Sequence, residues 1–178
     1  MLDFDKPSLA RRVGTLPMDG QLAFLLLLCE RQMPALREFA RETGLQASIY
    51  ETSLDLAWKN LAGAVTEINW QEMAETCFDS APDTEDYTHD LTSAALDTAL
   101  SVGLTMEFIA DRDIDHVVEA AYMAYGTADL YADGAGISWL RLTTLEGLNE
   151  RRLVQQELRQ QQADLEFVES LKTDSPEE

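Results

Sequence analysis

Carboxylates and a histidine crowd into one short stretch of the chain, and together such groups can bind zinc or iron. The cluster consists of Asp79, Asp83, Glu85, Asp86, His89 and Asp90, with His116 and Glu119 as additional candidates. Di-iron helical bundles carry Glu-x-x-His on two helices. Here Asp86 and His89 have that spacing once, in a stretch typical of a loop, while His116 and Glu119 run in the reverse order. A solvated acidic loop explains the cluster better, so we predict no metal ligands and no cofactor.

Nucleophilic and acid–base chemistry finds equally little support in the sequence. His89 and His116 are the only histidines, and a lone histidine near a helix start is more often a capping or surface residue. Cys29 ends the apolar run 22–29, where burial raises a thiol pKa and makes the group inert. No glycine-rich loop that could cradle a phosphate is present. We therefore predict no catalytic residue.

Cys29 and Cys77 are the only cysteines, and neither has a neighbouring partner at a metal or redox spacing. Both are predicted to be reduced, buried thiols, which is typical of a cytoplasmic protein. Residues on the second and third predicted helices are expected to gather as a packed core with a structural ion pair. That group is Cys29, Glu30, Arg31, Tyr50, Asp55 and Trp58.

The elements that would position these residues are all helices. Apolar residues recur every three or four positions, which predicts an all-α, single-domain bundle of about six to seven helices. The expected helices span 7–14, 19–41, 46–61, 69 to before 82, 91–110, 114 towards a turn at Gly134 and Gly136, and a long last helix over 144–172. Asn69 is a predicted N-cap and Gly44 a helix stop, and Asp5 lies just ahead of its helix, where the positive helix end favours a carboxylate. Pro34 is expected to kink or restart its helix.

Residues 1–172 are predicted to form the single domain, and residues 173–178 a disordered acidic tail. The last helix carries a regular apolar seam with one glutamine in it. Its members are Val154, Leu158, Gln161, Leu165 and Val168. Because fewer than three heptads are filled, we expect this helix to dock on the bundle and not to form an independent zipper.

The net charge is −20, and it is concentrated in the middle of the chain. Residues 60–140 contain sixteen acidic side chains and a single basic one, Arg112. Such a surface repels the phosphates of nucleic acids and anionic lipids, so neither is an expected partner. The acids keep the protein soluble, or they mimic a nucleic acid or dock on a basic partner.

The longest apolar run has eight residues against the roughly 20 that span a bilayer, and no signal peptide is expected. A cytoplasmic location follows.

A resemblance supports this interpretation. The segment 24–31, with Pro34 and the pair Thr43 and Gly44, resembles the YjaG-like family, a bacterial domain-of-unknown-function family. Further matches are Ile49-Tyr50, Leu54-Asp55-Leu56, Trp58, Asn69, Ala81-Pro82, Asp86, Ala95-Leu96-Asp97 and His116-Val117-Val118-Glu119. The resemblance covers residues 16–172 and departs from the family pattern between Tyr131 and Leu148. It implies a compact, all-helical cytoplasmic domain, and it implies no activity.

The function that these observations favour is a non-enzymatic helical domain that binds another protein, or itself, through an exposed helical face. One alternative is a metal-dependent or other enzyme that uses the Asp86 and His89 region. Another is an acidic nucleic-acid mimic that binds a basic protein.

Overall fold

Seven helices make up the described part of the chain, which covers residues 3–65, 67–132 and 151–173 of a computed structural model. They are α1 (Lys6–Gly14), α2 (Met18–Thr43), α3 (Ser48–Leu61), α4 (Trp70–Asp79), α5 (Thr92–Asp111), α6 (Ile114–Ala132) and α7 (Arg151–Thr173). These residues include no β-strand, so the prediction of an all-α fold is confirmed. The predicted turn at Gly134 and Gly136, the start of the last predicted helix and the tail from residue 174 lie outside the described residues.

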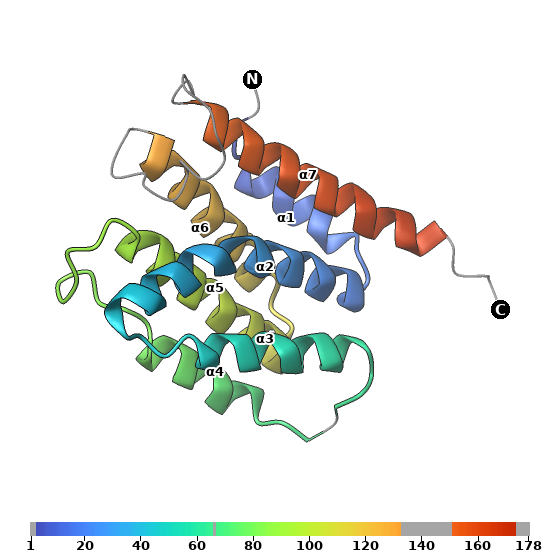
Figure 1. Ribbon diagram of the computed structural model, residues 1–178. Coiled ribbons are helices and arrows are strands. Elements are labelled where there is room, and N and C mark those ends of the chain that lie inside the picture. Colours follow the sequence, from blue (N-terminus) through green and yellow to red (C-terminus); the bar gives the residue numbers. More distant parts are fainter. Residues whose placement is uncertain (1–2, 66, 133–150, 174–178) are drawn as a thin grey trace.

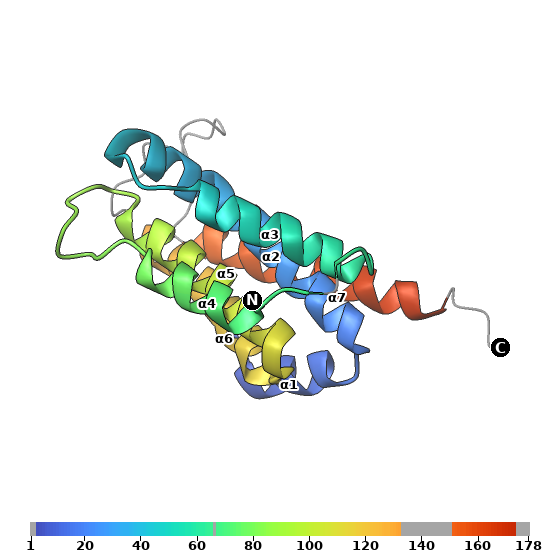
Figure 2. The ribbon, with the colours of Figure 1, turned by 90° about the horizontal axis from the view of Figure 1, so that it is seen from below.

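The helices stack in three layers (Figures 1 and 2). Helices α3 and α4 form one outer layer, α2 and α5 the middle, and α1, α6 and α7 the other outer layer. Helix α5 packs against α2, α3, α4 and α6, so it lies at the centre of the fold. Helix α7 lies along α6 and α2, which confirms that it docks on the bundle.

The helix ends follow the local chemistry that the sequence predicts. The Asp5 side chain accepts a hydrogen bond from the backbone N–H of Ser8 at 3.0 Å, and Asn69 does the same for Glu72 at 3.2 Å. These bonds satisfy amide groups that have no partner inside the first turn of a helix. Gly44 ends α2 with a φ of 84°, a conformation that a side chain disfavours.

Several predicted helix ends differ from the observed ones by a residue or two. Helix α2 continues through Pro34, with Met33 and Leu36 on either side fully buried in the core, so the restart does not occur and the alternative of a kink stays a prediction. Helix α3 begins at Ser48 and not at residue 46. Thr173 is the last residue of α7 and does not belong to the tail. Helix ends are set by packing as well as by the local sequence, so such shifts of a residue or two are common.

Small residues let α5 lie close to its neighbours. Ala95, Ala99, Ser101 and Gly103 are all buried on this helix. The hydroxyl of Thr105 donates to the Ser101 carbonyl at 2.9 Å, so its polar group is satisfied inside the core. The helices on both sides can therefore pack at short range around α5.

Helix α5 is also long and apolar enough to cross a membrane, by length and composition alone. It is the one helix of the described ranges with this property, and most of its side chains are buried inside the bundle. The apolar side chains of α5 therefore belong to the core, where this helix packs against α2, α4 and α6.

Gly103 provides a direct test of this close packing. A Cβ atom at that position would lie 2.3 Å from the Phe78 ring of α4, so we expect Gly103→Ala to lower the free energy of unfolding by about 1–3 kcal/mol. Gly126→Ala on α6 is the control: its Cβ would meet no heavy atom within 4 Å, and alanine favours a helix by up to about 1 kcal/mol. Urea unfolding measures both, and equal stabilities for the two variants would contradict the packing.

Candidate functional site

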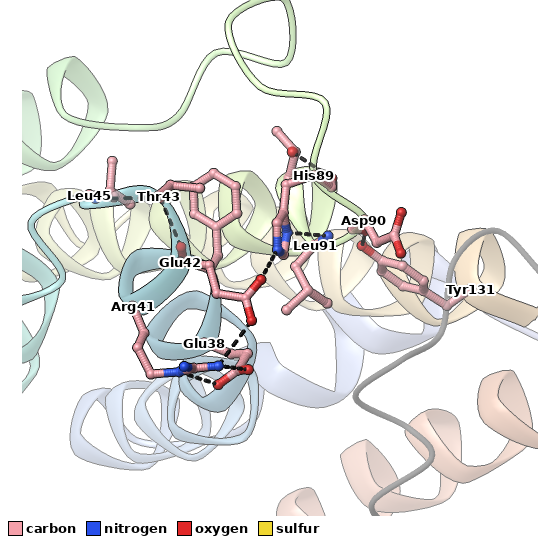
Figure 3. Close-up of polar contacts among 11 residues, drawn as sticks. Glu38, Arg41, Glu42, Thr43, Leu45, His89, Asp90, Leu91 and Tyr131 are labelled. Carbon is pink, nitrogen blue, oxygen red and sulfur yellow. Dashed lines mark hydrogen bonds and ion pairs between the residues drawn. The ribbon is translucent and has the colours of Figure 1, made fainter.

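His89 is held by both of its ring nitrogens (Figure 3). Its Nδ1 accepts a hydrogen bond from the backbone N–H of Leu91 at 3.1 Å, and its Nε2 lies 2.5 Å from Glu42 Oε2. Because Nδ1 accepts, the neutral ring carries its proton on Nε2 and donates it to the Glu42 carboxylate. The imidazole edge also meets the Phe39 ring, with 5.4 Å between centroids. His89 thus fastens the loop before α5 to the end of α2.

The same cluster continues along α2. Arg41 binds Glu38 through Nε at 3.1 Å and Glu42 through Nη2 at 2.9 Å. From the other side, the Tyr131 hydroxyl donates to the Asp90 carbonyl at 2.6 Å (Figure 3). These contacts join the loop to α2 and α6, which is a structural task.

The acidic cluster considered as a metal site is not joined by His116 and Glu119. His116 binds Asp111 at 3.0 Å and lies 3.4 Å from Glu107, whereas Glu119 pairs with Lys6 at 2.7 Å. His89 precedes α5 and His116 follows it, and a helix of 20 residues is about 30 Å long, so the two histidines lie at opposite ends of it. Within residues 3–65, 67–132 and 151–173, no group of three or more histidine, cysteine or acidic side chains could hold a metal ion.

The two thiols are buried, as predicted. Cys29 Sγ lies 3.3 Å from the Thr105 hydroxyl of α5, and Cys77 Sγ lies 3.5 Å from the Ser53 hydroxyl of α3. Burial raises the pKa of the Cys29 thiol to about 12, and it also raises the pKa of Cys77. Neither group is a thiolate near neutral pH, so neither is an activated nucleophile.

The group expected between α2 and α3 forms only in part. The Trp58 indole N–H donates to Glu30 Oε1 at 3.1 Å, which joins the two helices. Tyr50 instead donates to the Cys77 carbonyl of α4 at 3.2 Å, and Asp55 pairs with Lys59 at 2.6 Å. Arg31 turns away from α3 altogether.

Arg31 instead reaches from α2 to α7, which sequence reasoning missed. Its guanidinium binds Asp164, and its Nη2 lies 3.0 Å from Glu157 Oε1. Gln161 donates to the same Glu157 oxygen at 2.9 Å and to the Ala121 carbonyl of α6 at 3.0 Å. We call these four residues of α2 and α7 the Arg31 cluster. The spacing of Glu157, Gln161 and Asp164, which places them on one side of a helix beside the apolar seam, was the signal in the sequence.

A second arginine holds the other end of α7. Arg12 of α1 binds both carboxylate oxygens of Glu169, at 2.7 and 2.9 Å. This bidentate pair raises the pKa of Arg12, chiefly through its hydrogen bonds to Glu169. Three of the acids of α7 are therefore turned towards the bundle and neutralised there.

What remains on the solvent side of α7 we call the α7 outer face. It consists of Arg152, Gln156, Arg159, Gln160, Gln162, Ala163, Glu166, Phe167, Ser170 and Leu171. Phe167 is 55% exposed and Leu171 is 51% exposed, one helical turn apart. Two arginines and one glutamate are its only charged members, so it is not acidic, although the whole chain has a charge of −20. An exposed pair of large apolar side chains on a weakly charged helix is typical of an interaction surface.

Comparison with known proteins agrees with the fold. Residues 8–178 match a family described as "Protein of unknown function (DUF416)". A crystal structure of a DUF416 family protein from Shewanella baltica OS155 is similar, with a TM-score of 0.75 and 17% identity over 90% of this chain and 84% of that one. At that identity the likeness concerns the fold alone. No curated protein matches the chain.

The Arg31 cluster predicts a large stability effect. Arg31→Met leaves Glu157 and Asp164 without their cation, so we expect the free energy of unfolding to fall by about 3 kcal/mol. Arg37→Met is the matched control: it breaks an exposed pair with Glu51, which contributes about 1 kcal/mol or less. Denaturant unfolding compares the two, and hydrogen exchange should show the loss of protection in α7. Equal effects of the two substitutions would contradict the role of Arg31.

Asp97 should make the stability of the fold depend on pH. It lies on α5, accepts a hydrogen bond from the Thr127 hydroxyl of α6, and has its pKa raised above 3.8 by burial. The folded state therefore binds this proton more tightly than the unfolded state, and stability is lost as pH rises from about 3.8 through the folded pKa.

We expect Asp97→Asn, which keeps an acceptor for Thr127, to remove this loss. Its stability relative to the natural chain should increase with pH across that window and then remain constant. Thermal unfolding between pH 3 and 7 measures it, with the exposed Asp129→Asn as a control of equal charge. Parallel profiles for the natural chain and Asp97→Asn would refute the assignment.

Proposed function

The chain belongs to the DUF416 family, for which no function is described, and from that premise we propose that it is a helical protein-interaction domain. The α7 outer face is its binding surface. The observation that carries the proposal is the exposure of Phe167 and Leu171 on consecutive turns of a helix that turns three of its acids, Glu157, Asp164 and Glu169, towards the bundle.

No other helix of the described residues offers such a pair. The other exposed large apolar side chains are Met18 on α2 and Tyr122 and Leu130 on α6, and no two of them lie one turn apart. Isolated exposed apolar residues are normal on protein surfaces, whereas neighbouring ones on one helix can enter a groove or pack on a second helix. The α7 outer face is therefore the better candidate.

Charge supports the same surface. Two proteins that approach each other through strongly acidic faces repel, whereas the α7 outer face has only three charged residues of mixed sign. An enzyme centred on Asp86 and His89 has less support, because both ring nitrogens of His89 are already engaged.

A second candidate is the acidic surface of residues 60–140, which would bind a basic protein. Exposed Glu72, Glu75 and Asp79 on α4 favour it, because they present negative charge without basic neighbours in that stretch of sequence. This surface lies on the opposite outer layer from α7 (Figure 1), so an experiment can separate the two.

Several finer assignments belong to the proposal. The segment 24–31 and the matches downstream of it support a place among the YjaG-like members of the family, and hence a bacterial source. The two buried free thiols support a cytoplasmic location. The acidic composition argues against nucleic acids and anionic membranes as partners.

Site-specific photo-crosslinking tests the proposal. A photoreactive phenylalanine analogue in place of Phe167 should give adducts in the native cell, because this side chain would lie inside the interface. The same group in place of the exposed Glu75 is the control and should give none. Adducts from position 75 alone would favour the acidic surface. Adducts from neither position would refute the interaction function.

A further inference from the structure

Helix α7 separates its charges by face. Its acids Glu157, Asp164 and Glu169 are neutralised by Arg31 and Arg12 on the inner side. Its outer face keeps two arginines towards the beginning of the helix and Glu166 towards the end. The charge of the outer face therefore changes sign along the helix: the first half is basic and the second half is acidic.

We propose that two copies of this chain pair through the α7 outer face, with the two α7 helices antiparallel and crossing at Ala163. This inference rests on the proposed function, for which it names the partner. A small residue at the crossing point lets two helices approach closely, since the distance between helix axes depends on the side chains at the contact. The residues beside Ala163 on this face, Gln160 and Phe167, follow at spacings of three and four.

Charge complementarity fixes the direction. In an antiparallel pair centred on Ala163, Arg159 lies opposite Phe167 of the second copy and one residue from Glu166 of that copy. The two-fold symmetry repeats the contact, so each dimer contains two Arg159–Glu166 pairs. A parallel, in-register pair would instead place Arg159 beside Arg159 and Glu166 beside Glu166, and like charges repel.

The apolar side chains fit the same arrangement. Phe167 would lie under the Arg159 guanidinium of the second copy, and an arginine over an aromatic ring is attracted by it. Leu171 would pack on the aliphatic part of the Gln156 side chain of the second copy. Both side chains are about half exposed in the single chain, so pairing removes their apolar surface from water.

The charge of the whole molecule limits the alternatives. Two copies, each with a net charge of −20, repel each other over most of their surfaces. Residues 60–140 contribute most of that charge, and α4 and α5 belong to that stretch. Self-association therefore requires a face without net negative charge, which the α7 outer face provides.

Analytical ultracentrifugation of the full chain tests the pairing. We expect a reversible monomer–dimer equilibrium, with Arg159→Glu and Glu166→Arg each weakening dimerisation about tenfold or more, because each substitution turns two attractive contacts into repulsive ones. The double variant Arg159→Glu with Glu166→Arg restores both pairs with the signs exchanged. Its dimerisation should therefore return to within about threefold of the natural chain.

Controls match each variant in net charge. Arg37→Glu on α2 and Glu75→Arg on α4 change exposed sites away from α7 and should leave dimerisation unchanged.

Phe167→Ser should weaken the dimer without unfolding the monomer, since its side chain is 55% exposed, and circular dichroism checks that each variant is folded.

A natural chain that stays monomeric up to millimolar concentration would overturn the pairing, and so would a double variant as weak as the single ones. These outcomes are distinct from failure of the proposed function. Adducts at position 167 with a different protein, together with a monomeric chain, would leave the interaction function intact and end self-pairing. A dimer that none of the α7 substitutions affects would place the interface elsewhere and refute the inference.

Discussion

The guanidinium of Arg31 sets the orientation of α7. It reaches from the middle of α2 to the buried Asp164 and the partly buried Glu157, and it provides the counter-ion for both carboxylates. Breaking a buried ion pair costs far more than losing a surface pair, because a charge is left uncompensated in a poorly solvated place. The docked rotation of α7 follows from this contact, and so does the composition of its outer face.

This constraint links the core to the surface. Helix α7 can dock with Glu157, Asp164 and Glu169 inward only because the neighbouring helices provide arginines. Arg12 on α1 completes the arrangement by binding Glu169. The face left to solvent then has only three charged residues, of mixed sign, and carries Phe167 and Leu171. In a chain of charge −20, such a face is the exception, which is why the proposed interaction function rests on it.

The two histidines and Cys29, which could in principle do chemistry, make contacts that hold the fold together. His89 joins a loop to α2 through Glu42, and His116 pairs with acids at the far end of α5. Burial raises the pKa of Cys29, so this thiol is an apolar core group with a weak hydrogen bond to Thr105. Each of these contacts joins two elements of the fold.

The sequence alone determined the fold class, the helix caps and the buried seam of α7. Each of these depends on residues three or four positions apart, and the period of a helix makes such neighbours predictable. The tertiary structure decided what pairs over long distances. Arg31 was expected near α3 but meets α7, more than 100 residues away, and His116, considered only as a possible addition to the acidic cluster around His89, lies at the opposite end of α5. Local periodicity shows which side of a helix is apolar, but not which helix lies against that side, because many arrangements of the same helices bury the same stripes. Only the packed arrangement brings an arginine of one helix to the carboxylates of another, and it thereby decides which face of α7 remains free to bind.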